Sequence, residues 1–250
     1  MNRYYDKKVL RELKLWQYRM LANPSFFDRL SKRFQNKMNS FIPEKIHRAI
    51  TVTIKQMVRG VLYGANITTA KFNKDVSLQV RDALAEEKIR LYQKTAAAEG
   101  GITGAGGILS GLADFPLLIG IKFKLLFELA TIYGYDLKDY KERLYILYIF
   151  QLAFSSPQHR KNIYQRMVSW KEQREHLPED IHEFNWRSFQ QEYRDYIDIA
   201  KMAQLVPVIG APVGAIVNYR LIKKLGITAV NAYRMRAVEF PGKPGDEPTG

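Results

Sequence analysis

Cysteine is absent from the 250-residue sequence. Its absence excludes a disulfide framework, a thiolate metal site and a cysteine nucleophile, and it suits the reducing conditions of the cytoplasm. The first residues, MNRYYDKKVLRELKLW, lack the uninterrupted apolar core of a secretory signal, so we expect no export. Alternation of apolar and polar residues, the pattern of half-buried strands, is also hard to find, whereas helical periodicity is common.

Acidic residues are few: 25 Asp and Glu oppose 39 Lys and Arg, which gives a net charge of +14. Residues 1–40 carry +7, and residues 199–238, which contain no acid, carry +6. Most of the excess charge therefore lies near the two ends. A composition of 46% hydrophobic and 26% charged residues is typical of a soluble globular protein. Such a basic surface attracts anionic lipid headgroups, nucleic acid or acidic partners, and solubility is the plainer alternative.

Helical patterns cover most of the chain. Val9, Leu13, Trp16 and Met20 recur at helical spacing with basic residues between them, which predicts a basic amphipathic helix. A second basic helix is expected at 25–38, and further helices at 46–61, 76–97, 116–133 and 144–154, then one ending near 174, one at 189–202 and one ending near 238. We expect one all-α domain, residues 1–238, with two glycine-rich apolar segments in its core, and a disordered tail, residues 239–250.

The stretch GGITGAGGILSGLADFPLLIGIK, residues 100–122, contains a single acid, Asp114. A phosphate-binding loop is excluded, because a glycine and an isoleucine stand where Lys and Ser or Thr are required. A Rossmann turn lacks its third glycine. Asp114, Pro116 and the many glycines oppose a transmembrane helix, although a hairpin that enters the membrane reversibly stays an alternative. Asp114 instead suits the N-cap of a new helix with Pro116 in its first turn.

Glycines in the apolar stretches recur four residues apart, which places them on one helix face where another backbone can approach closely. We expect these segments to pack against one another as a seam, inside the protein or within lipid. The expected seam residues are Gly60, Gly64, Gly100, Gly104, Gly107, Gly111, Gly210 and Gly214.

Asp114 and Glu128 lie among apolar residues, where burial would raise the pKa of a carboxyl group. If Asp114 caps the helix, about 20 Å of helical rise separates the two acids, too far for one acid/base pair. Lys124 lies four residues before Glu128, and an ion pair between them is the simplest arrangement. If the two glycine stretches pair, Asn218 or Arg220 would contact Asp114 and form a buried polar latch.

Other site chemistries find little support in the sequence. Ser110 lacks the G-x-S-x-G spacing of a nucleophile elbow. The stretch EHLPEDIHEF holds His176 and His182 among four acids, but its spacing matches no standard zinc site. We therefore expect a solvated acidic loop there, no metal and no other cofactor. The basic helices contain no recognised module for reading nucleic acid, so nucleic acid is not an expected partner.

The run GLADFPLLIGIKFKLLFELATIYGYDL and the later run VPVIGAPVGAIVNYRLIKKLG resemble the EcsC family, and so does the N-terminal VLRELKLWQYRM. The resemblance covers nearly the whole chain apart from the tail. It implies an accessory protein encoded beside the ATPase and membrane subunits of an ABC exporter. It supplies no catalytic residues to transfer to this chain.

The basic ends and the resemblance together predict a non-enzymatic cytoplasmic protein that binds the inner face of the cell membrane peripherally and supports an ABC exporter. Trp16 and Phe26 would anchor in the membrane interface. The alternative is a hydrolase that acts on a lipid or a membrane peptide through Asp114 or Glu128. The basic residues expected at the lipid headgroups, or at a partner, are Lys7, Lys8, Arg11, Lys14, Arg29, Lys32, Arg33, Lys37, Arg220, Lys223 and Lys224.

Overall fold

The computed structural model describes residues 3–22, 44–63, 76–105, 114–185, 187–189, 191 and 211–238. The described chain is helical, which confirms the all-α prediction. Its elements are α1 (Arg3–Leu21), α3 (Glu44–Tyr63), α4 (Leu78–Ala105), α6 (Phe115–Ile132), α7 (Tyr140–Phe154), α8 (Pro157–Val168), α9 (Trp170–Glu175), the 3₁₀-helix η1 (Ile181–Glu183) and α12 (Ala211–Ala237). The expected helix at 25–38, almost all of the one at 189–202 and the tail lie outside the described residues.

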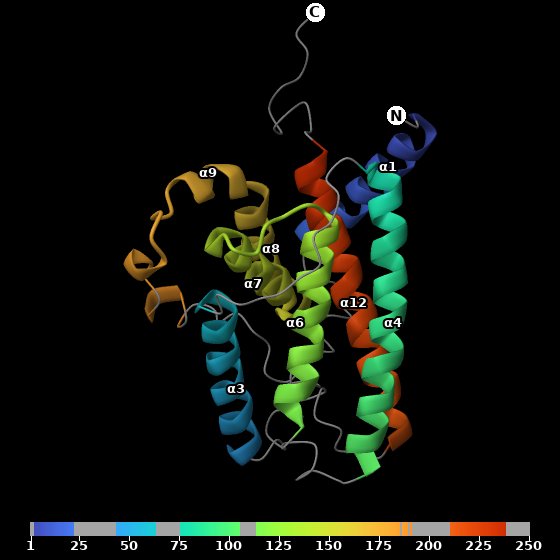
Figure 1. Ribbon diagram of the computed structural model, residues 1–250, viewed down its shortest axis with the longest axis vertical. Coiled ribbons are helices and arrows are strands. Elements are labelled where there is room, and N and C mark those ends of the chain that lie inside the picture. Colours follow the sequence, from blue (N-terminus) through green and yellow to red (C-terminus); the bar gives the residue numbers. More distant parts are fainter. Residues whose placement is uncertain are drawn as a thin grey trace, which may run out of the picture.

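Three long helices, α4, α6 and α12, stand side by side in the bundle (Figure 1). The chain of α4 ends where those of α6 and α12 begin, so α4 is antiparallel to both (Figure 1). The antiparallel register of α4 and α12 is visible in successive contacts along the pair. Arg234 bonds Asp82 near one end, Gly226 faces Ile89, Gln93 donates to the Tyr219 carbonyl, and Gly214 meets Gly100 near the other end.

Helix α7 is the central helix, because all of its residues are buried. It packs against α3, α6, α8 and α12. Its sequence, YKERLYILYIFQLAF, is apolar after the first turn except at Gln151, as expected of a helix surrounded by others. The charged residues of that first turn are buried and paired: Lys141 with Glu179, Glu142 with Arg236, and Arg143 with backbone carbonyls that include that of Leu62 in α3.

Helix α4 continues to Ala105, eight residues beyond the end expected at 97. Glycine is a poor helix former in isolation, so GGITG predicts an early end. In the structure Gly100 is buried against α12, and this tertiary contact outweighs the low helix propensity. Helix α6 begins with Asp114 at the N-cap position and Pro116 in the first turn, as expected, although the Asp114 side chain makes no capping hydrogen bond.

Gly100 allows a close approach between the backbones of α4 and α12. A Cβ atom at this position would lie 2.7 Å from the Gly214 carbonyl oxygen and 2.7 Å from the Asn218 side-chain nitrogen. Gly60, another expected seam residue, is different: it is exposed in α3, and nothing lies within 4 Å of an added Cβ atom. Gly60 therefore does not belong to the seam. Gly226 of α12, which was not selected from the sequence, does lie in close contact with α4, because an added Cβ atom there would meet the Ile89 side chain.

Gly100→Ala is expected to lower the free energy of unfolding by roughly 1–3 kcal/mol, because backbone atoms of α12 occupy the space that the new methyl group needs. Gly60→Ala is the matched control. It lies inside a helix with open space beside it, so alanine should raise the free energy of unfolding by about 0.5–1 kcal/mol. Urea unfolding measures both changes, and effects of the same sign would contradict the seam at Gly100.

Candidate functional site

A buried lysine lies at the seam between α6 and α12. Lys122 is fully buried, and its Nζ atom donates to the Leu118 carbonyl and to the Asn218 side-chain oxygen, both at 3.1 Å. Asn218 in turn donates to the Gly214 carbonyl at 3.2 Å. Both acceptors of Lys122 are uncharged, so the cation is solvated by dipoles. Burial lowers the pKa of Lys122 to about 7.

The observed partner of Asn218 differs from the expected polar latch. Asn218 is buried as the latch requires, but it bonds Lys122, whereas Arg220 is exposed and Asp114 is half-buried at the start of α6. Lys122 was overlooked because it stands between apolar residues in IGIKFK. A signal was available: Leu118, Lys122 and Leu125 follow the spacing of one helix face, and that face is buried.

Glu128 is half-buried and bonded across the interface between α4 and α6. It accepts a hydrogen bond from Tyr92 at 2.6 Å and lies 2.9 Å from Lys88. Its strongest ion pair is therefore with Lys88 of α4, not with Lys124 as expected. Burial opposes ionisation of Glu128, but the bonds from Tyr92 and Lys88 outweigh it and hold the pKa of Glu128 below its ordinary value. The expected rise in this pKa is wrong.

The hydrolase alternative gains little from these positions. Asp114 and Glu128 lie at opposite ends of α6, about 20 Å apart by helical rise. The side chains bonded to Glu128 are a tyrosine and a lysine, and its low pKa makes it a poor general acid at neutral pH. No group of three or more side chains suited to hold a metal ion occurs in the described part of the chain.

A polar cluster that sequence reasoning missed joins α1, α4, α6 and α12. Asp82 accepts hydrogen bonds from Tyr5 and Tyr133 and pairs with Arg234 at 3.0 Å. Arg234 also pairs with Glu12 of α1 at 3.0 Å. Burial and the nearby Asp82 carboxylate raise the pKa of both tyrosines, so both phenols stay protonated donors. These residues are far apart in the sequence, and no local motif marks them.

A second missed cluster fixes the end of α12 to the central helix. Arg236 binds Glu142 through two hydrogen bonds of 2.6 and 2.9 Å, and its guanidinium lies over the rings of Tyr135 and Tyr145. Tyr233 stacks on Tyr135. Both clusters neutralise buried acids with arginine and carry no nucleophile, so we interpret them as structural.

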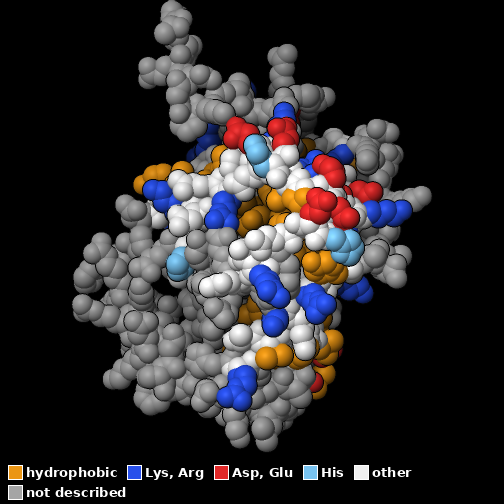
Figure 2. Space-filling view, turned by 90° about the vertical axis from the view of Figure 1, so that its left-hand side faces the viewer, with side chains coloured by type: hydrophobic (Ala, Val, Ile, Leu, Met, Phe, Trp, Pro, Cys, Tyr) orange, Lys and Arg blue, Asp and Glu red, His pale blue; other side chains and the backbone are white. Residues whose placement is uncertain are grey.

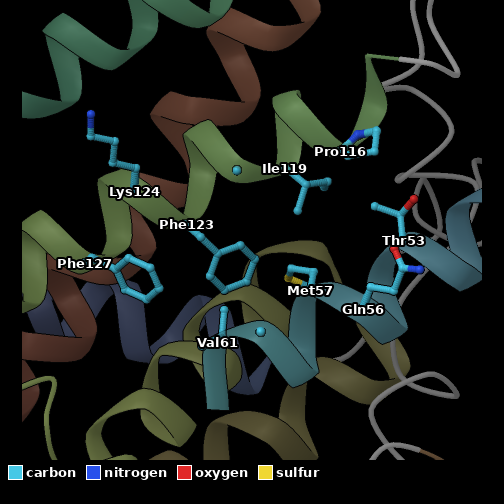
Figure 3. Close-up of a pocket in the computed structure, with 11 residues that line it drawn as sticks. Thr53, Gln56, Met57, Val61, Pro116, Ile119, Phe123, Lys124 and Phe127 are labelled. Atoms are coloured by element: carbon cyan, nitrogen blue, oxygen red, sulfur yellow. The ribbon is translucent and has the colours of Figure 1, made fainter. Parts of the chain in front are cut away.

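A shallow groove of about 410 Å³ lies between α3 and α6. Phe123 and Ile119 of α6 face Met57 and Val61 of α3 across it, and the Lys124 side chain extends away from α3 (Figure 3). The described residues that line the groove include no acid, serine or histidine. The described lining of the groove therefore offers mainly apolar contact.

The basic residues expected at a membrane form two groups. The first, on α1, contains Lys7, Lys8, Arg11 and Lys14, which are all exposed. The second, on α12, contains Arg220, Lys223 and Lys224, also exposed. Phe26, Arg29, Lys32, Arg33, Lys37, Gly64, Gly107, Gly111 and Gly210 lie outside the described residues, as do the Gly104 surroundings.

Trp16 is the clearest correction among the expected membrane residues. Its side chain is buried, with its ring edge-on to Tyr164 of α8 at 5.7 Å between centroids. The apolar stripe of α1 therefore packs on the protein core and does not anchor in lipid. The acidic loop is exposed as expected, and Asp and Glu side chains gather in the upper part of the face shown in Figure 2.

Among the described helices, none is long and apolar enough to cross a membrane. The family model for the EcsC protein family matches residues 7–238, and the chain is 46% identical to Protein EcsC of Bacillus subtilis (strain 168) over 94% of this chain and 97% of that protein. The chain belongs to the EcsC family. It is also similar to another Bacillus subtilis protein, the uncharacterized YdbA, at 26% identity over 92% of this chain and 91% of that protein. No solved structure matches.

Membership of the EcsC family confirms the resemblance expected from the sequence. The match runs from within α1 to the residue after α12, so it includes both glycine stretches and the buried Lys122. The names of these two relatives state no reaction, and they give no catalytic residue to place on this bundle.

The pKa of Lys122 leads to a pH dependence of stability. Between pH 7 and the ordinary lysine pKa of about 10.4, the unfolded chain keeps a proton that the folded protein has lost. Stability therefore rises with pH in this window, by roughly 2 kcal/mol between pH 7 and pH 9. Lys122→Met should remove this rise, whereas Lys124→Met, an exposed neighbour, should retain it.

Urea unfolding of the three proteins at pH 7 and pH 9 measures these differences. An equal rise in stability in the Lys122→Met variant would show that Lys122 releases no proton on folding.

Proposed function

We propose that this member of the EcsC family is a non-enzymatic accessory protein that binds the anionic inner face of the cell membrane peripherally and supports an ABC exporter or its regulation. The proposal rests on where the basic side chains of α12 point. This helix contains no acid. Its two C-terminal arginines turn inward onto acids of other helices, and its remaining basic side chains are exposed.

The two arginines that point inward form ion pairs with acids that would otherwise reduce the positive charge of the surface. Arg234 and Arg236 neutralise Glu12, Asp82 and Glu142, which belong to α1, α4 and α7. Glu12 lies 3.9 Å from Lys8 of the same helix, but Arg234 of α12 is closer to Glu12, at 3.0 Å. After these pairings, the exposed basic residues include Lys7, Arg11 and Lys14 of α1 and Arg220 and Lys223 of α12, a helix that contains no acid of its own.

Each basic side chain close to an anionic membrane contributes about 1 kcal/mol of binding free energy, so three in contact favour anionic over neutral lipid by roughly 100-fold. This attraction needs no apolar span, which agrees with the described helices. The exporter part of the proposal rests on what EcsC membership implies, namely an accessory role beside an ATPase and a membrane subunit. The protein would meet one of those subunits at the same membrane face.

Co-sedimentation with vesicles tests the membrane part. The purified protein should bind vesicles that contain phosphatidylglycerol, should bind pure phosphatidylcholine roughly 100-fold more weakly, and should dissociate as salt is raised, because screening shortens the reach of the charges. Binding that is equal on both lipids or insensitive to salt would contradict electrostatic attachment. An absence of binding to either lipid would remove the membrane from the proposal.

A further inference from the structure

We infer that the bilayer docks on one particular end of the bundle, where α4 ends and α6 and α12 begin. This inference rests on the proposed membrane association and adds the face that makes the contact. We call this region the glycine-rich end and define it by residues 91–105, 114–124 and 211–224.

Contacts between the helices place the three helices of the glycine-rich end at a common level. Gly100 of α4 meets Gly214 of α12, and Asn218 of α12 bonds Lys122 of α6. The same Lys122 bonds the carbonyl of Leu118, one turn from the start of α6. The last turns of α4 and the first turns of α6 and α12 therefore lie beside one another, as Figure 1 also shows.

Each of these helices exposes a large apolar side chain in its terminal turns. Ile102, three residues before the end of α4, is 71% exposed. Leu117, two residues after the start of α6, is 52% exposed, and Ile216, five residues after the start of α12, is 53% exposed. Single exposed apolar residues are ordinary, but three at one end of three neighbouring helices form a candidate contact for lipid.

On each of the three helices, an exposed basic side chain lies farther from the helix end than the exposed apolar side chain does. Lys124 and Lys223 lie seven residues inward from Leu117 and Ile216, and Lys94 lies eight residues inward from Ile102. At 1.5 Å of rise per residue, these spacings correspond to about 10–12 Å along each axis. An interfacial protein buries its apolar side chains about 5–10 Å deep, which brings the basic residues to the phosphates.

The charge of the glycine-rich end complements an anionic surface. Apart from the buried Lys122, it contains five Lys and Arg, all exposed, against two acids, Glu99 and Asp114, which are half-buried. The preceding half of α4, residues 78–90, contains three basic and three acidic residues and is neutral. The Asp and Glu side chains on the face shown in Figure 2 gather in its upper part. An anionic bilayer is therefore attracted to the glycine-rich end.

The α1 basic group cannot meet the same flat membrane. Tyr5 of α1 bonds Asp82, which lies 20 residues, or about 30 Å of helix, from Ile102 on α4. This distance greatly exceeds the Debye length of about 8 Å at physiological ionic strength. The α1 residues therefore provide a charge control, and exposed apolar residues elsewhere provide an apolar control.

The test uses flotation with phosphatidylglycerol-containing and pure phosphatidylcholine vesicles at physiological salt. The triple variant Ile102→Ser, Leu117→Ser, Ile216→Ser should weaken binding to the anionic vesicles by about tenfold or more, and so should Arg220→Glu with Lys223→Glu. Leu15→Ser with Val168→Ser, which are 53% and 55% exposed in α1 and α8, should change binding less than about twofold. Lys7→Glu with Lys8→Glu should behave like this control.

A second measurement does not depend on the stability of the triple variant. Because the chain has no cysteine, Ile216→Cys, Leu117→Cys and Leu15→Cys can each carry one environment-sensitive fluorophore. Anionic vesicles should shift the emission of the labels at 216 and 117 to the blue and leave the label at 15 unchanged.

Vesicle binding that persists in the serine triple variant, together with unchanged emission at 216 and 117, would overturn the inference and leave membrane association standing. Binding lost only in the Lys7→Glu, Lys8→Glu variant would assign the contact to α1 and also overturn it. A wild-type protein that binds neither vesicle would overturn the inference and the proposed membrane association together.

Discussion

The absence of a side chain at Gly100 lets α4 and α12 meet backbone to backbone, and this contact sets the level of the polar groups along both helices. From that point, further contacts join the two antiparallel helices: Gln93 bonds Tyr219, and Asp82 bonds Arg234. If a larger residue at position 100 pushed the helices apart, the network around Asp82 would lose its geometry as well. One close approach therefore links the glycine-rich end to the opposite end, where α1 is held through Tyr5 and Glu12.

The same seam explains how a lysine is kept inside. Lys122 reaches Asn218 because Gly100 leaves room for the amide to lie between the helices, where it also donates to the Gly214 carbonyl. Burial of a charge among uncharged acceptors costs stability, and the lowered pKa is one measure of that cost. An apolar residue would fill the position more cheaply, so packing alone does not explain why lysine occupies it.

The sequence predicted helices where local pattern and packing agree. The expected helix at 116–133 is observed at Phe115–Ile132, because a proline in the first turn and an apolar run act in the same direction. The sequence-based predictions failed where a contact between helices determines the structure. Helix α4 continues through its glycines because α12 covers Gly100. Glu128 pairs with Lys88 of α4, although Lys124 lies on the same helix as Glu128. Trp16 shows a third limit. Its helical spacing indicates an apolar face, but only the packing on α8 shows that protein and not lipid covers it.

The two C-terminal arginines of α12 and the exposed lysines have different roles in this EcsC-family protein, although Arg11 and Arg220 are also exposed and Lys122 and Lys141 are buried. Arg234 and Arg236 have planar guanidinium groups that suit paired carboxylate oxygens and tyrosine rings, and both lie inside. The lysines of α1 and Lys223 of α12 are compact, strongly hydrated cations on flexible stems, and they are exposed. Because Arg234 and Arg236 pair with Asp82 and Glu142 inside the bundle, these two acids do not offset the exposed basic charge. The basic surface is thus a consequence of how the core is held together, and it exists only when the bundle is folded.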